Sequence, residues 1–213
     1  MWGCVAGIGG GAGLALLYSA LASGQMSIAS PVSALVAAGL PVLVGAFSEG
    51  LPGAGTLIGF ALALAAVWLV SGGFGVKLQI EKILLPLLSG VCFAAFFIFL
   101  DRGSSQSILW PLVATRIASI TSLLSFSVAT RQPWLPTRDS WIPILISSLL
   151  DSAGNALYAM SARMGRMDVA AVLGSLYPGS TVLLAWFVLK ERVSPMQMVG
   201  ILVALAAIVL ITI

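Results

Sequence analysis

Long apolar stretches alternate along the chain with short clusters of charged residues, prolines and glycines. A membrane-spanning helix needs about 20 mostly apolar residues. Backbone groups in hydrocarbon must satisfy their own hydrogen bonds, and the alternating pattern of a membrane barrel is absent, so these stretches are predicted to be helices. The predicted segments are 3–22, 27–47, 54–71, 83–100, 108–129, 140–162, 167–189 and 196–213. The predicted fold class is an all-α polytopic membrane bundle of about eight transmembrane helices.

The composition supports a membrane protein rather than a soluble one. Of the 213 residues, 60% are hydrophobic and 8% are charged, histidine is absent, and the mean hydropathy is +1.11. A soluble domain carries about 25% charged residues. We therefore expect a multi-pass integral protein of the cell membrane, with the lipid bilayer around it. Ten Lys and Arg residues spread over short loops form no nucleic-acid footprint, so no nucleic-acid partner is expected.

The residue types present do not indicate an enzyme. Cys4 and Cys92 lie inside apolar runs and show no metal or redox spacing. A membrane-embedded enzyme needs a nucleophile with a base, paired acids or a metal constellation, and the sequence shows none of these patterns. We therefore expect no enzyme activity, no cofactor and no metal.

Glycines near the start of the chain resemble a phosphate-binding loop only superficially. The run lacks the Lys and the Ser or Thr that would hold a phosphate and its metal, and no strand precedes it. Glycines four residues apart let two helix backbones approach closely. The spacings of Gly3 with Gly7 and of Gly9 with Gly13 therefore predict tight helix packing.

An internal repetition divides the chain into two related units. The stretch that begins at Tyr18 and reaches Glu49 has a counterpart from Tyr158 to Glu191, with short gaps between the copies. Two apolar segments precede the second copy, whereas the first copy lacks this leading pair. Each unit is therefore interpreted as five helices, the first one incomplete. Paired repeats with an odd number of helices insert in opposite senses and enclose a substrate site near the midplane.

The repeated motifs resemble a known family. YAMSARMG at 158–165, SLYP at 175–178 and LKERVS at 189–194 resemble the second EamA repeat of the drug/metabolite transporter superfamily. LYSAL at 17–21 and PVSAL at 31–35, with the later Pro41 and Glu49, resemble the end of the first repeat. The resemblance divides the chain into an incomplete first repeat of three helices at 1–73 and a second repeat of five helices at 83–213.

This resemblance implies a ten-helix secondary transporter with a central cavity between its repeats. Such transporters often export amino acids, other metabolites or drugs, so the expected partner is a small-molecule substrate. The chain departs from the pattern because the first two helices are missing. A late start, a truncated gene, a dimer or a helix-supplying partner would each account for this departure. The alternative function is a non-transporting membrane scaffold or an inactive truncated fragment.

Two charged residues fall inside predicted spans. A charged side chain at the bilayer centre costs about 2.5–3.5 kcal/mol on insertion scales, so Arg116 and Asp151 require an explanation. Their spans follow one another in the chain, which permits a contact between them. One interpretation is a structural ion pair that fixes helix packing. Our hypothesis is that both side chains face the transport cavity.

Polar residues also line one face of the segment 140–162. Ser147, Asp151, Asn155 and Tyr158 follow one another at spacings of four, four and three residues, which places them on one helical face. These side chains either hydrogen-bond between helices, at about 0.6 kcal/mol per contact, or form a substrate-facing wall. We favour the wall, because repeat transporters keep their cavity at such a position.

A proline interrupts the segment 167–189. Pro178 removes one backbone donor and predicts a kink, with Ser175 and Tyr177 beside it. Exposed backbone polarity is tolerated only against protein or water, which favours a cavity or a helix junction there. The simpler interpretation is a structural bend. Ser175, Tyr177 and Pro178 complete the set of predicted substrate-binding residues.

Overall fold

A computed structural model of the chain describes residues 1–22, 26–48, 50–70, 83–105, 107–131, 140–177, 187 and 194–212. Helices account for nearly all of these residues, and none of the described residues forms a strand. The helices are α1 (Trp2–Ala22), α2 (Met26–Ser48), α3 (Ala54–Val70), α4 (Leu84–Gly103), α5 (Leu109–Ala129), α6 (Trp141–Met164), α7 (Met167–Gly174) and α9 (Pro195–Thr212). The prediction of an all-α membrane bundle is confirmed.

The helix bounds agree closely with the apolar segments of the sequence, except in the seventh. There α7 ends at Gly174, and most of the predicted remainder up to 189 lies outside the described residues. Three helices, α1, α4 and α5, are long and apolar enough to cross a membrane. Shorter apolar helical stretches lie within α2, α3 and α9. The agreement follows from the bilayer, which accepts a single chain segment only as a helix.

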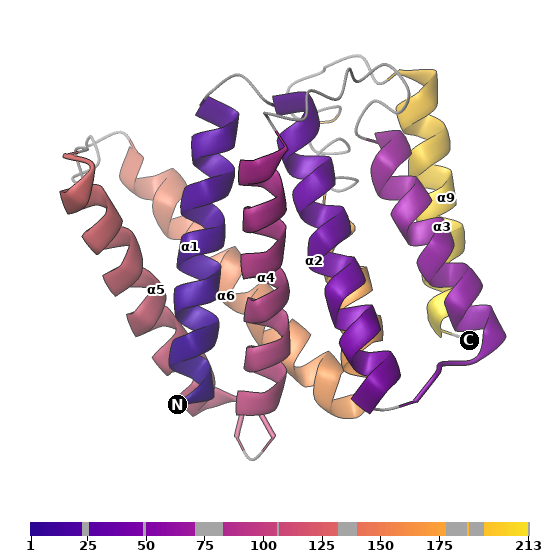
Figure 1. Cartoon of the computed structure of the whole chain (residues 1–213), viewed down its shortest axis with the longest axis horizontal. Helices are drawn as coiled ribbons and strands as arrows, with labels where there is room; N and C mark the ends of the chain where they lie inside the picture. Colours follow the sequence, from indigo (N-terminus) through magenta and orange to yellow (C-terminus); the bar gives the residue numbers. More distant parts are fainter. Residues whose placement is uncertain are drawn as a thin grey trace.

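Successive helices run in opposite directions along the bundle, and α1 lies between α4 and α5 (Figure 1). In Figure 1, α5, α1, α4, α2 and α3 stand side by side, α6 and α7 lie behind them, and α9 lies beside α3. The most extensive helix contacts join α3 to α9 and join α1 to both α4 and α5. The α3 and α9 helices run in opposite directions, and so do α1 and α6 (Figure 1).

Glycines set the close approach of α1 to α5. A Cβ atom on Gly7 would lie 2.3 Å from the carbonyl oxygen of Thr115, and one on Gly3 would lie 2.7 Å from that of Pro111. Hydroxyl groups then reach across the interface: Thr115 donates to the Gly3 carbonyl at 3.0 Å, and Ser119 donates to the Gly7 carbonyl at 2.8 Å. The packing predicted from the glycine spacing is confirmed here.

The opposite face of α1 packs on α4 in the same way. A Cβ atom on Gly9 would lie 3.0 Å from the Cys92 carbonyl oxygen, and one on Gly13 would lie 2.9 Å from the ring of Phe93, so both positions favour glycine. Ser89 on α4 donates to the Gly13 carbonyl at 2.9 Å and lies 3.1 Å from the hydroxyl of Ser33 on α2. These buried hydroxyls connect α1, α2 and α4.

The first half of α6 is the least covered part of the bundle. Every residue from 141 to 154 is exposed, whereas Tyr158, Ala159 and Ala162 in the second half are buried. Only the second half therefore belongs to the core. Tyr158 and Ala162 join a buried cluster with Phe96 and Leu100 of α4.

Candidate functional site

An ion pair links the interiors of α5 and α6. The guanidinium of Arg116 donates to the Asp151 carboxylate at 2.5 Å, and the two side chains are 38% and 60% exposed. Neither residue lies near the end of its helix. The contact that the order of the spans permits between these two charges is therefore present. Because both side chains are accessible, the pair lines an open surface rather than a sealed core.

One neighbour on α6 extends this pair. The Asn155 amide donates to the same carboxylate oxygen of Asp151, at 3.5 Å. Ser147 lies exposed on the earlier turn, where its hydroxyl donates to the Ile144 carbonyl of its own helix at 3.0 Å. Arg116, Asp151 and Asn155 thus form one polar cluster, which we call the charged cluster, and Ser147 lies beyond it.

Tyr158 points elsewhere, into the packed half of α6. Its ring is buried and lies 4.7 Å from the ring of Phe97, and its hydroxyl donates to the Phe97 carbonyl at 3.0 Å. This geometry joins α6 to α4. The role of Tyr158 in a substrate-facing wall stays a prediction.

The structure places the residues predicted around the kink apart from the charged cluster. Ser175 is buried just beyond the end of α7, and its hydroxyl donates to the Val172 carbonyl at 2.7 Å. The Tyr177 hydroxyl donates to the Ser30 carbonyl of α2 at 3.4 Å. Pro178 lies outside the described residues. Ser175 and Tyr177 therefore take part in helix contacts, and their substrate role stays a prediction.

A second ion pair was not singled out from the sequence. Arg166 donates twice to the Asp168 carboxylate, at 3.1 and 2.8 Å, and once to the Gly50 carbonyl at 2.8 Å. Asp168 is fully buried against Gly45, where a Cβ atom would lie 2.9 Å from its carboxylate oxygen. Gly50 has a φ of +80°, which favours glycine. We call the arrangement of Arg166 and Asp168 against Gly45 and Gly50 the α2–α7 latch.

The sequence itself indicated only the part of the latch at the start of α7. An arginine two residues before an aspartate stands immediately ahead of an apolar run, where an acid is favourable in the first turn of a helix. The sequence did not indicate that this ion pair would pack against Gly45 in the last turn of α2, or that the Gly50 carbonyl just beyond α2 would accept from Arg166.

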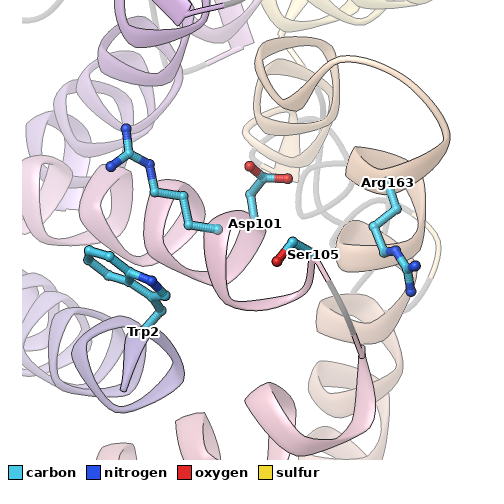
Figure 2. Close-up of a pocket in the computed structure, with 5 residues that line it drawn as sticks. Trp2, Asp101, Ser105 and Arg163 are labelled. Atoms are coloured by element: carbon cyan, nitrogen blue, oxygen red, sulfur yellow. The ribbon is translucent and has the colours of Figure 1, made fainter.

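A polar pocket lies at one end of the bundle, away from the charged cluster. It has a volume of about 650 Å³ and is lined by Trp2, Asp101, Arg102, Ser105 and Arg163. Its walls come from the start of α1, the end of α4 and the end of α6 (Figure 2). No sequence pattern brought these residues together, because they belong to three separate helix ends.

In the part of the chain that the structure describes, no cluster of three or more His, Cys, Asp or Glu side chains could hold a metal ion. Cys4 and Cys92 are free cysteines on α1 and α4.

An all-helical apolar bundle with charged residues inside its helices is typical of an integral membrane protein. Comparison with known sequences specifies the class: residues 81–213 match the EamA-like transporter family, and the chain belongs to that family. This result confirms the resemblance to EamA proteins of the drug/metabolite transporter superfamily.

A sequence relative agrees with this assignment, and a solved structure shares the fold. Over 131 residues the chain is 28% identical to the Uncharacterized transporter sll1319 of Synechocystis sp. (strain ATCC 27184 / PCC 6803 / Kazusa), an alignment that covers 59% of this chain and 39% of that protein. A solved structure described only as "Crystal structure of protein" shares the fold, with a TM-score of 0.73 and 18% sequence identity. That match covers 100% of this chain and 87% of the solved one.

Proposed function

We propose that the protein is a secondary transporter of the cell membrane that exports a small metabolite, such as an amino acid, or a drug. The observation that carries this proposal is the Arg116–Asp151 pair, which is held inside two apolar helices and yet remains accessible. Ionisable residues at such positions mark substrate or ion pathways by default. The family assignment supports the same class of activity.

The chemistry of the charged cluster favours a substrate that carries both signs of charge. A guanidinium binds a carboxylate through a planar fork of donors. The Asp151 carboxylate accepts from Arg116 and Asn155, and a substrate ammonium would compete for the same oxygens. A zwitterionic metabolite would therefore break the Arg116–Asp151 pair and form two new ion pairs, one with each of these side chains. An apolar solute would have to leave the internal pair intact.

The arrangement of the helices supports alternating access. The opposite directions of α1 and α6, and of α3 and α9, are those expected of two related units that insert in opposite senses (Figure 1). We propose that the units rock about the α3–α9 contact and expose the charged cluster first to one side of the membrane and then to the other.

Substrate counterflow in liposomes tests this function. Purified protein is reconstituted and screened against amino acids and cationic dyes, and the Asp151→Asn and Arg116→Gln variants are then compared with the unaltered protein. Ser152→Ala is the matched control, because Ser152 lies beside Asp151 and its hydroxyl donates only to the Ser148 carbonyl of its own helix. We expect both charge variants to lose counterflow and the control to keep it. Full activity of both charge variants would refute the proposed role of the cluster.

The exposed half of α6 bears on the partners of the protein. Residues 141–154 of α6, which include Asp151, are left exposed by the rest of the described chain. We propose that a second copy or a helix-supplying partner packs on this face. The absence of transport from a well-folded, reconstituted protein across the whole screen would favour the alternative of a membrane scaffold.

A further inference from the structure

The polar pocket at the end of the bundle is separate from the charged cluster. Figure 2 shows Asp101 and Ser105 at the end of α4, between Trp2 of α1 and Arg163 of α6. Arg102 completes the lining of this space of about 650 Å³. Side chains that are distant in sequence thus surround one volume large enough for a polar group of several atoms.

The charges around the pocket favour an anion. Arg102 and Arg163 lie in the last turns of α4 and α6, where the helix dipole stabilises a cation. Guanidinium groups bind phosphate oxygens through two parallel N–H bonds. Among the described lining residues, one carboxylate, that of Asp101, stands against the two guanidinium groups, so this part of the lining carries a net charge of +1. That charge matches a phosphodiester, which carries one negative charge, better than a doubly charged phosphomonoester.

The position of Trp2 relates the pocket to the membrane surface. Its indole stacks on the Phe99 ring, with 5.5 Å between the centroids and 8° between the planes. A Cβ atom on Gly103 would lie 3.2 Å from the Cβ atom of Trp2, so glycine permits this close packing. Tryptophan side chains at helix ends prefer the level of the lipid headgroups. The pocket therefore lies where phospholipid phosphates are concentrated.

From these features we propose that the pocket binds the phosphodiester of an anionic phospholipid. Arg102 and Arg163 contact the phosphate oxygens, Trp2 lies against the glycerol region, and Asp101 limits the site to a single negative charge. Basic pockets between membrane helices bind lipid headgroups by this chemistry. The bound lipid would hold the ends of α1, α4 and α6 together. This inference does not depend on the proposed transport activity.

Native mass spectrometry of the detergent-solubilised protein with added lipid tests this site. We expect phosphatidylglycerol to be retained in preference to phosphatidylcholine, and Arg102→Gln and Arg163→Gln each to weaken retention about fivefold, since each basic residue contributes about that factor near a surface. Asp101→Asn should strengthen retention. Arg131→Gln is the matched control, because Arg131 is an exposed arginine after the end of α5, at the opposite end of the bundle.

Competition with inorganic phosphate shows whether the bound phosphate group belongs to a lipid or to a soluble ligand. Retention of phosphatidylglycerol in excess sodium phosphate supports a lipid site, whereas displacement supports the same phosphate chemistry with a soluble ligand. Equal retention of the two lipids would overturn the proposal, and so would losses in the two pocket variants no larger than the loss in Arg131→Gln. Circular dichroism of each variant identifies any that fail to fold, and the gain expected for Asp101→Asn cannot arise from misfolding.

Discussion

The contact between α1 and α5 offers a direct test of the packing. In the Gly7→Ala variant, the new methyl group would lie 2.3 Å from the Thr115 carbonyl oxygen and 2.7 Å from the Ala118 Cβ atom, whereas ordinary contacts begin near 3.4 Å. The helices would have to separate by about 1 Å. The hydrogen bonds from Thr115 to Gly3 and from Ser119 to Gly7, now 3.0 and 2.8 Å long, would then exceed the hydrogen-bonding range.

The expected loss follows from these contacts. Two interhelical hydrogen bonds contribute about 1.2 kcal/mol in a membrane protein, at about 0.6 kcal/mol each. Overpacking costs a further 1–3 kcal/mol, roughly. The better helix propensity of alanine, worth about 1 kcal/mol, opposes this loss. Gly39→Ala provides the same gain in propensity on α2, where a Cβ atom meets nothing within 4 Å. The Gly7→Ala variant should therefore be less stable than Gly39→Ala by about 2–4 kcal/mol.

Unfolding in mixed micelles, followed by circular dichroism, measures this difference. Counterflow adds a functional measurement, because Arg116 directly follows Thr115 on the displaced helix. We expect transport to fall in Gly7→Ala and to persist in Gly39→Ala. Equal free energies of unfolding for the two variants would show that α1 and α5 do not approach each other as closely as these distances require.

Three further substitutions test other parts of the bundle. Asp168→Ala should lower the free energy of unfolding by about 3 kcal/mol, which is the lower end of the range for a broken buried ion pair, because the remaining Arg166 is 27% exposed. A loss under about 1 kcal/mol in the same unfolding assay would contradict this. Tyr158→Phe removes only the hydroxyl that donates to the Phe97 carbonyl and should lower the free energy of unfolding by about 0.6 kcal/mol. A raised KM of counterflow in this variant would support the predicted place of Tyr158 in the substrate-facing wall, whereas an unchanged KM would contradict it. Leu149→Cys, on the exposed half of α6, should form a crosslink to a second protein in oxidised membranes; a monomer band alone on a gel would indicate that lipid covers this face.

Much of the fold was predictable, because the bilayer restricts what a chain can do. Apolar runs such as 108–129 have to form helices in hydrocarbon, and α5 (Leu109–Ala129) agrees within one residue at its start. The glycine spacing of α1 likewise predicted close packing, because glycine is the residue that lets helix backbones touch. The sequence did not indicate which helices those glycines would meet. That choice depends on how α4 and α5 fold back onto α1.

The candidate site was predictable only in part, for a related reason. Helical spacing places residues on a face, and the cost of an intramembrane charge identified Arg116 and Asp151 as a pair. Spacing does not determine what each turn of the helix meets. Tyr158 shares a face with Asp151, yet it lies seven residues further along α6, where α4 covers the helix. The latch and the polar pocket were not predicted, because each depends on helix ends that meet only in the folded chain.

A comparison of the Arg116–Asp151 and Arg166–Asp168 ion pairs shows why an intramembrane charge needs a structure before it is assigned a role. Asp168 is fully buried, accepts two bonds from Arg166, and sits in a space that only glycine at position 45 leaves open, so moving it would leave a buried charge unpaired. Asp151 is 60% exposed, and Arg116 and a single amide bind it across loosely packed helices. An ion pair that the substrate must replace in every transport cycle has to break at a low cost in free energy. The accessible pair meets that condition and the buried pair does not, which is why we assign substrate contact to Arg116 and Asp151 and a structural role to the α2–α7 latch.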